Sequence, residues 1–364
     1  MVKIVTYKPE SKDLVVEAFA ERPKAHFKYL PNLNMGIYDC EAADKAGSCL
    51  NSSVSTIQAV EDDQEVHALF VKEKYNPSAN LNVRDIFEDD NEATWGIQAI
   101  DADWTTYSGK GIKVCILDTG FDKDHIDFKG RKITTASFVP GESAMDGHGH
   151  GTHCIGTACG YKDQKGRRYG VAYESEIISG KVLSNRGSGS MAGILEGIDW
   201  ALGQGAKIIS MSLGDTSSQP RQAYEEAARR AMEKGCLIIA AAGNHRPGTV
   251  GSPANSPSVV AVGAIDSKLE LAYFSCGSGS AEGAQVSVVA PGVAVYSSIP
   301  GNKYATWNGT SMATPHAAGV AALLWQQNPK MSPQQLRKLL EESAYELEIP
   351  EVDQGTGLVM APMP

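Results

Sequence analysis

Short apolar runs alternate with longer helix-like segments over most of this chain. The apolar runs are rich in β-branched residues and predict strands at residues 113–117, 177–183, 207–211, 237–241 and 259–262. Segments with helical periodicity predict helices at residues 151–159, 191–202, 222–234 and 311–327. Strands that are apolar on both faces and separated by helices indicate an α/β fold, with a mostly parallel twisted sheet and helices on both of its faces.

The first 72 residues have a different pattern. They predict strands or extended segments at residues 2–7, 25–29, 35–38 and 66–71, and helices at 12–21 and 41–48. This order is typical of a small α+β sandwich of the ferredoxin-like kind. The polar stretch that follows contains an acidic cluster at residues 88–92 and predicts a linker. We therefore expect two domains in the 364 residues.

Charge and composition narrow the class of protein. A net charge of -10 argues against nucleic acid as a partner. No run approaches the ~18 apolar residues that span a bilayer, so no membrane association is expected. The first residues lack the pattern of a secretory leader, and we expect either an internal protein or one whose leader has been removed. The seven cysteines form no C-x-x-C pair, and their odd number leaves at least one unpaired within the chain.

A serine, an acid and an amide stand where such a sheet gathers its functional groups. Ser311 follows Gly309 at the head of a helical segment, and its hydroxyl needs a neighbouring base to become a nucleophile. Asp118 and Asn244 each follow a predicted strand, at the carboxyl edge of the sheet. Each also has a simpler interpretation as a turn residue. In the catalytic interpretation, the Asn244 amide donates to the oxyanion that forms when the serine attacks a carbonyl.

Three histidines lie among glycines before and within the predicted helix at 151–159. His148, His150 and His153 are candidate bases, and the small Gly149 and Gly151 leave room for one of them to approach a serine. The residue pattern alone does not select which one. The same cluster is open to interpretation as a metal site with close ligand spacing, although no paired cysteine accompanies it. A metallohydrolase is therefore an alternative.

A second glycine-rich segment, Gly187, Ser188 and Gly189, opens the predicted helix at 191–202. It resembles a dinucleotide-binding turn, but the next strand does not end in the acid that such a site requires. An extended Gly-Ser-Gly edge can instead pair its backbone with a peptide strand.

Four motifs, in this chain order, resemble those of the subtilisin-like serine proteases, the subtilase family. They are Ile-Leu-Asp-Thr-Gly at 116–120, His-Gly-Thr-His at 150–153, Ala-Ala-Gly-Asn at 241–244 and Gly-Thr-Ser-Met-Ala-Thr-Pro-His at 309–316, and the resemblance spans residues 95–359. It implies a serine endopeptidase in which His150 takes the proton of Ser311 while Asp118 orients the imidazole. It also implies an oxyanion hole formed by Asn244 and the Ser311 amide.

The resemblance also implies how protein or peptide substrates bind. The substrate backbone would lie as an added strand between two segments of the enzyme, Ser212, Leu213 and Gly214 on one side and Gly187, Ser188 and Gly189 on the other. Met191 and Ile194 stand where the family lines a pocket for the fourth residue before the cut. An apolar preference at that substrate position is implied.

Residues 1–72 resemble a subtilase propeptide in position, length and pattern. In the family this domain is an intramolecular chaperone and inhibitor that is later removed. We therefore expect a zymogen with a propeptide at 1–72, a linker with the processing site at 73–91 and a catalytic domain at 92–364. A latent complex that retains its propeptide and turns over little substrate is the alternative. We also expect a monomer that is secreted or extracellular, with an intracellular location as the alternative.

Calcium is the cofactor that the resemblance implies. Subtilases often bind one ion through an aspartate after the catalytic one, a residue near the mature N-terminus and a loop after the histidine helix. Asp127, Asn91 and Asp163 occupy comparable places, and hard oxygen ligands suit the ion. The loop around Asp163, residues 162–168, is basic, whereas the usual loop of the family is neutral.

Overall fold

The computed structural model describes residues 2–8, 25–40, 57–71, 86–246, 248–277 and 285–364. Its central element is a seven-stranded sheet in which all neighbouring strands are parallel. The five strands predicted in this region are confirmed. In spatial order the sheet contains β14 (Val288–Pro291), β13 (Val260–Ile265), β12 (Leu237–Ala241), β10 (Ile208–Met211), β6 (Lys113–Asp118), β8 (Glu176–Lys181) and β7 (Ile133–Ser137).

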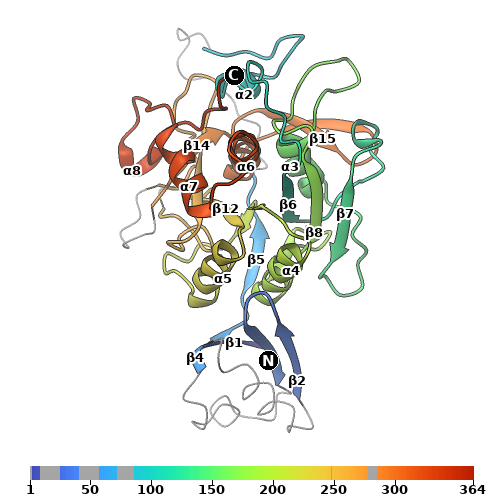
Figure 1. Ribbon diagram of the computed structural model, residues 1–364, viewed down its shortest axis with the longest axis vertical. Helices are drawn as coiled ribbons and strands as arrows, with labels where there is room; N and C mark the ends of the chain where they lie inside the picture. Colours follow the sequence, from blue (N-terminus) through green and yellow to red (C-terminus); the bar gives the residue numbers. More distant parts are fainter. Residues whose placement is uncertain (1, 9–24, 41–56, 72–85, 247, 278–284) are drawn as a thin grey trace.

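Helices cover both faces of this sheet, as Figure 1 shows. α3 (His150–Cys159) and α6 (Thr310–Gln327) pack together on one face, and α4 (Met191–Gly203) and α5 (Gln222–Glu233) pack together on the other. These are the four helices that the periodicity predicts, so the α/β fold class is confirmed. The domain is completed by α2 (Trp95–Ala99), the 3₁₀ helix η2 (Ile126–Phe128), the antiparallel hairpin of β15 (Val295–Ile299) and β16 (Lys303–Trp307), α7 (Pro333–Glu342) and α8 (Glu351–Gln354).

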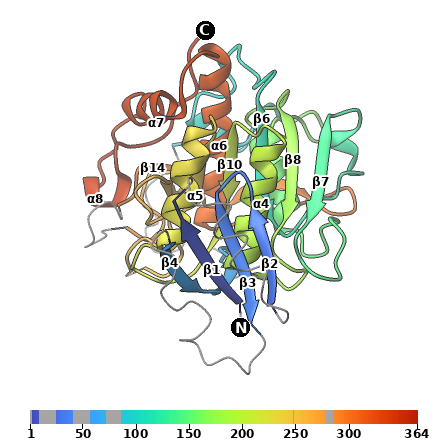
Figure 2. The same cartoon turned by 60° about the horizontal axis from the view of Figure 1, so that its bottom comes forward.

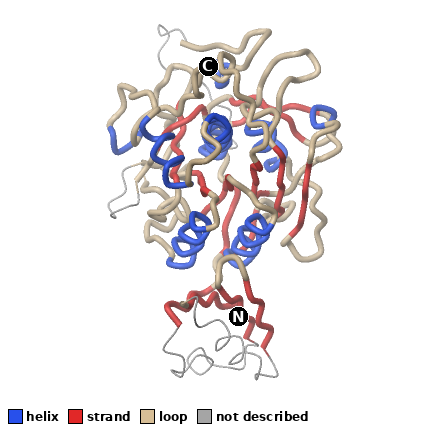
Figure 3. The backbone as a smooth tube through the Cα atoms, viewed as in Figure 1, coloured by secondary structure: helices blue, strands red, loops and turns tan. Residues whose placement is uncertain are grey.

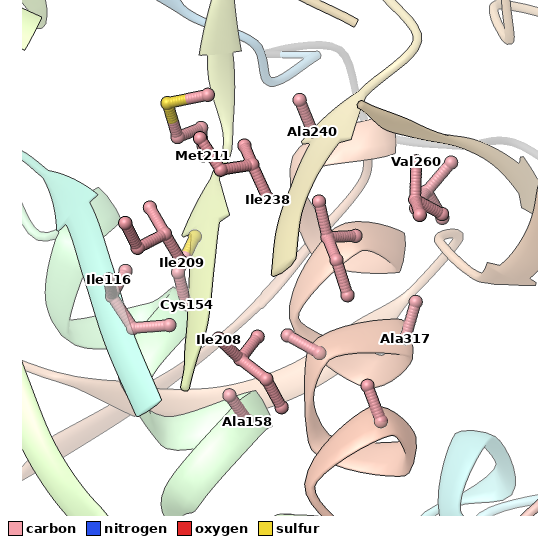
Figure 4. Packing of buried hydrophobic residues seen from close by; sticks show 14 of the residues in the cluster. Ile116, Cys154, Ala158, Ile208, Ile209, Met211, Ile238, Ala240, Val260 and Ala317 are labelled. Carbon is pink, nitrogen blue, oxygen red and sulfur yellow. The ribbon is translucent and has the colours of Figure 1, made fainter. Parts of the chain in front are cut away.

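The core lies where α3 and α6 meet the middle of the sheet. Figure 4 shows aliphatic side chains of β6, β10, β12 and β13 beside small residues of the two helices, among them Ala158 and Ala317. Small helix residues let the helix axes approach the strands closely. Among the helices of the described ranges, none combines the length and apolar character that crossing a bilayer demands.

The N-terminal region forms a separate four-stranded antiparallel sheet. Its strand order is β2 (Ala25–Leu30), β3 (Met35–Cys40), β1 (Val2–Tyr7) and β4 (Ile57–Asp62). The predicted helices at 12–21 and 41–48 lie outside the described residues. This sheet packs against the outer side of α4 and α5 (Figure 2).

Acidic side chains of the N-terminal region bind the starts of both helices. Asp63 Oδ1 accepts from the Ala192 amide in α4 at 2.9 Å, and Glu61 Oε2 accepts from the Ala223 amide in α5 at 2.6 Å. A negative charge at a helix N-terminus is favourable because the first amides lack partners within the helix.

β5 (Glu65–Ala68) leaves this N-terminal sheet and enters the larger domain. In Figures 1 and 3 it runs upward from the sheet past α4 and α5. There it forms the middle strand of a three-stranded antiparallel sheet with β9 (Ser188–Ser190) and β11 (Leu213–Gly214). The sequence predicts that residues 66–71 complete the N-terminal unit, and this is wrong. β4 completes that sheet instead, and its residues alternate between half-buried and exposed.

Candidate active site

The predicted catalytic residues lie at the carboxyl edge of the parallel sheet. Asp118 is the last residue of β6, His150 is the first residue of α3, and Ser311 lies in the first turn of α6. All three are buried, with at most 1% of each residue exposed. Because two helices begin here, the positive ends of their dipoles face the site and favour negative charge in it.

Asp118 and His150 form the central hydrogen bond of the site. The Nδ1 of His150 donates to Oδ1 of Asp118 at 2.7 Å, and the Thr119 amide donates to the same oxygen at 2.7 Å. Burial by itself lowers the pKa of His150, but the Asp118 carboxylate, together with Cys154 and the hydrogen bonds to both, holds this pKa well above its usual value. The pair thus fixes the tautomer in which Nε2 of the neutral ring can accept a proton.

Two glycine positions allow His150 to approach Asp118. Gly149 precedes the helix at φ 103°, in the left-handed region that favours glycine. A Cβ on Gly151 would lie 2.2 Å from the carbonyl oxygen of Gly120. Any other residue at position 151 would therefore push the helix, and the imidazole with it, away from the turn that carries Asp118.

The Ser311 hydroxyl is in a resting position. Its Oγ donates to the backbone oxygen of Ser212 at 2.9 Å. In the described part of the chain, Nε2 of His150 has no hydrogen-bond partner. The Sγ of Cys154 lies 3.8 Å from Nδ1 of His150 and 3.5 Å from the backbone oxygen of Ser311, so base and nucleophile flank the same buried sulfur. The base and the nucleophile are therefore not hydrogen-bonded to each other in this state.

Asn244 is oriented as a hydrogen-bond donor to the site. Its Oδ1 accepts from the amide and the hydroxyl of Thr310, both at 2.9 Å. Its buried Nδ2 has no acceptor among the described residues. Because an unsatisfied buried donor costs about 1–3 kcal/mol, its presence here indicates a position prepared for an oxygen that arrives with the substrate.

The other two histidines do not join a metal site. Nε2 of His153 lies 3.1 Å from the backbone oxygen of Val295 and 3.2 Å from that of Ala305, and its ring stacks on Trp307. Burial lowers the pKa of His153 to about 3, so its ring is neutral. Within the described ranges, one group of potential metal-ligating atoms occurs, and it consists of Asp118, His150 and Cys154. The geometry therefore selects His150 as the base and does not support the three-histidine alternative.

The groove beside these residues is filled by the chain's own residues 65–71. The Ala68 amide donates to the Gly187 oxygen at 2.9 Å, and the Leu69 amide donates to the Ser212 oxygen at 3.3 Å. Beyond them, the Val71 amide donates to the backbone oxygen of Asn308 at 2.9 Å. The extended segment is thus held by backbone hydrogen bonds on both sides of the peptide bond that joins residues 69 and 70.

This peptide bond lies next to Gly309, two residues before Ser311. A Cβ built on Gly309 would lie 2.8 Å from the Leu69 oxygen and 3.3 Å from Nδ2 of Asn244. The ring of Phe70 lies 5.5 Å from the ring of His150 and stacks on that of Trp307. The Leu69 oxygen and the Asn244 amide thus both lie beside Gly309, and the Phe70 side chain lies beside the imidazole.

Comparison with known proteins gives the same result as the geometry. The family model for the subtilase family matches residues 109–358. The chain belongs to the subtilase family. It is 43% identical to Alkaline elastase YaB of Bacillus sp. (strain YaB), over 75% of this chain and 72% of that protein. It is 42% identical to Subtilisin Savinase of Lederbergia lenta, over 73% of this chain and 96% of that protein. The protein is therefore a serine endopeptidase, as the motifs predict.

The predicted substrate-binding residues of this subtilase lie on both sides of β5. Val66 pairs with Gly189 of β9, while His67 and Ala68 pair with Gly214 and Leu213 of β11. Met191 and Ile194, on the first turn of α4, are fully buried. Val66 is also fully buried, so the fourth residue before the 69–70 bond occupies an apolar environment.

Two buried charged residues that support the subtilase triad were not found by sequence reasoning. Asp146 accepts hydrogen bonds from the amides of His148, Gly149 and Thr152 and from the hydroxyls of Thr119 and Thr152, at 2.7–3.0 Å. Lys181, at the end of β8, donates to the backbone oxygen of Thr119. Both side chains fix the turn after Asp118. The signal for Asp146 was its place four residues before His150, where a carboxylate can bind the first amides of α3.

The three residues predicted to bind calcium do not share one set of contacts. Asp127 and Asp163 are each hydrogen-bonded to tyrosines, and their side chains are at most 4% exposed. Asn91 is exposed on the segment before α2. Calcium binding stays a prediction that no observation of an ion tests.

Proposed function

We propose that this subtilase is synthesised as a zymogen and that its first substrate is its own peptide bond between Leu69 and Phe70. The supporting observation is the register of residues 65–71 in the groove, with hydrogen bonds from the Leu69 amide before the bond and from the Val71 amide after it. Extended binding of this kind uses backbone hydrogen bonds for affinity and side-chain pockets for specificity. The cut would fall just before the linker at 73–91 that the sequence suggests.

The residues of the site have distinct roles in this reaction. Ser311 Oγ attacks the Leu69 carbonyl carbon, and its proton passes to Nε2 of His150, whose positive charge the Asp118 carboxylate stabilises. The carbonyl oxygen becomes an oxyanion that accepts from Nδ2 of Asn244; removing such a donor from subtilisin itself costs about 3–4 kcal/mol in the barrier. His150 then gives the proton to the Phe70 nitrogen, the C–N bond breaks, and water hydrolyses the Leu69 ester by the same route.

The same groove supports a preference among other protein and peptide substrates. The residue before the bond is leucine, and its side chain lies beside Gly214, where a Cβ would be 3.3 Å from a Leu69 methyl carbon. The buried Val66 occupies the position for which Met191 and Ile194 predict an apolar residue. We propose that the enzyme favours an aliphatic residue before the cut and another four residues before it.

The contacts of the N-terminal region support a further role as an inhibitor after cleavage. Its bonds to α4 and α5, through Asp63 and Glu61, are remote from the cut and do not depend on an intact 69–70 bond. The region would therefore stay in the groove until it is released or digested.

The test is purification of the full chain, followed by intact mass and N-terminal sequencing of the fragments. We expect a catalytic fragment that begins at Phe70. Ser311→Ala should leave the chain uncut, whereas Ser343→Ala, a serine remote from the site at the end of α7, should be processed normally. A fragment that begins within 73–91 would move the cut into the linker. Equal processing in Ser311→Ala and the native chain would remove Ser311 from the role of nucleophile.

A further inference from the structure

Both oxygens of the Asp127 carboxylate, which the family pattern assigns to calcium, are already hydrogen-bonded to protein groups. Tyr169 donates to Oδ2 at 2.7 Å, and Tyr304 lies 2.9 and 3.0 Å from Oδ1 and Oδ2. An ordinary tyrosine hydroxyl keeps its proton at neutral pH, so both phenols can donate to this carboxylate. Both carboxylate oxygens therefore face hydrogen-bond donors.

Both oxygens of the Asp163 carboxylate are hydrogen-bonded in the same way. Its Oδ1 accepts from the amides of Lys165 and Arg167 at 2.9 and 3.0 Å, so the loop is wound around the carboxylate. Its Oδ2 accepts from the hydroxyl of Tyr296 at 3.1 Å. A calcium ion takes six to eight oxygen ligands at about 2.3–2.6 Å, and loop amides that point inward are the opposite of what it needs.

A guanidinium group lies at the centre of this cluster. Arg167 donates to Oδ2 of Asp89 at 3.0 Å, and its Nε lies 3.7 Å from Oδ2 of Asp163. Its guanidinium carbon lies 4.2 Å from the centre of the Tyr296 ring, in a cation–π contact. The Tyr296 ring in turn stacks on that of Tyr304, at 5.2 Å and 11°. One side chain thus joins the loop to the segment before α2, which are two of the three parts that an ion would connect, and it also contacts the β15–β16 hairpin.

The charge of the loop also opposes a second cation. Residues 162–168 contain four basic side chains, namely Lys162, Lys165, Arg167 and Arg168, and one acid, Asp163. A divalent ion at Asp163 would be repelled by these charges, and it would have to displace the guanidinium from its two carboxylates. The residues present therefore do not fit calcium.

We propose that Arg167 and the phenols of Tyr169, Tyr296 and Tyr304 fasten this corner of the subtilase in the place of a structural calcium ion. The protein then carries its own cation, and its stability does not depend on calcium bound by Asp127 and Asp163. This proposal is independent of where the chain is processed.

The test is thermal unfolding of the full chain in the Ser311→Ala background, which prevents self-digestion. Each protein is measured in millimolar calcium chloride and again in excess chelator. The calcium response of Asp163→Ala, which lacks both side-chain oxygens at the loop, serves as the reference for ions bound elsewhere. We expect the native loop and Asp163→Ala to gain the same amount from calcium. A larger gain for the native loop would show an ion at this position and overturn the proposal.

Arg167→Met tests the part played by the guanidinium. The matched control is Arg229→Met on α5, because Arg229 also makes ion pairs, with Glu226 and Glu233, but on an exposed surface. We expect Arg167→Met to lower the unfolding midpoint by about 2–4 °C more than the control does. Equal midpoints for the two variants would also overturn the proposal.

Discussion

The acidic contacts between the N-terminal region and the catalytic domain allow a quantitative prediction about inhibition. Two of the first three amides of α4 are satisfied from outside the domain, since Met191 donates to the Gln64 oxygen at 2.8 Å and Ala192 donates to Asp63 at 2.9 Å. α5 has no side-chain cap of its own, and Glu61 binds its second amide, that of Ala223. Removing either carboxylate leaves a helix terminus without its charged partner.

The size of the effect follows from helix-capping energies. Loss of a capping side chain costs about 1 kcal/mol, and loss of a negative charge from the positive end of a helix costs about 0.3–1 kcal/mol more. A total of about 1–2 kcal/mol weakens binding of the cleaved N-terminal region by about 5–30-fold. The two carboxylates bind different helices, so we expect Glu61→Ala combined with Asp63→Ala to weaken binding by about 30-fold or more.

The assay is the dilution of fully processed protein into a fluorogenic peptide, with initial rates read before the released fragment is digested. The concentration at which half of the enzyme is active should rise about 5–30-fold in Asp63→Ala. Asp62→Ala is the matched control, because Asp62 is exposed and pairs with Lys3 inside the N-terminal sheet. If Asp62→Ala and Asp63→Ala release the enzyme at the same concentration, the helix contacts do not contribute and the reasoning is wrong.

Two further predictions concern Asp118 and Asp146, the carboxylates that hold His150 and its helix in place. The raised pKa of His150 places the acid limb of the kcat/KM profile at a higher pH than for a free imidazole, so activity falls as pH falls through that pKa. Asp118→Asn should move this limb to lower pH and lower kcat by about 10⁴-fold. A limb that does not move in the pH profile of this variant would contradict the assigned cause. The same raised pKa stabilises the fold below the unfolded pKa of about 6.5, and this contribution is lost as pH rises through the folded pKa. Asp146→Asn replaces an acceptor of the Thr152 amide with a donor. We expect it to lower the free energy of unfolding, measured in urea, by about 1.5–3 kcal/mol and to reduce kcat more than it raises KM. Unchanged stability and kcat would show that Asp146 does not position α3.

The sequence predicted the central sheet well because its strands carry their own signal. β6, β8, β10, β12 and β13 are apolar on both faces, and burial on both faces is what a covered parallel sheet requires. β7, with Ile133 followed by threonines, lies at the sheet edge and lacks that signal. The places of Asp118, His150 and Ser311 at the carboxyl edge of the sheet were predictable because each lies at the end of one element. The resting hydrogen bond of Ser311 was not, since it depends on a backbone oxygen 99 positions away.

Two other errors or gaps arise from contacts between distant segments. The apolar run at 66–71 reads as an ordinary strand, and nothing local shows that its partners are β9 and β11 of another domain. The hydrogen bonds of Asp127 were hidden in the same way, because Tyr304, which supplies two of its contacts, lies 177 positions later.

The three-stranded sheet of β5, β9 and β11 makes the seating of residues 65–68 depend on the folded catalytic domain. β9 and β11 come into register only after the segments around residues 188 and 213 have reached their final places, and the strand between them cannot be seated before that. A misfolded copy would thus stay uncleaved and would not digest neighbouring proteins. If the proposed cleavage occurs, a cut chain would therefore be one in which these segments have already reached their final positions.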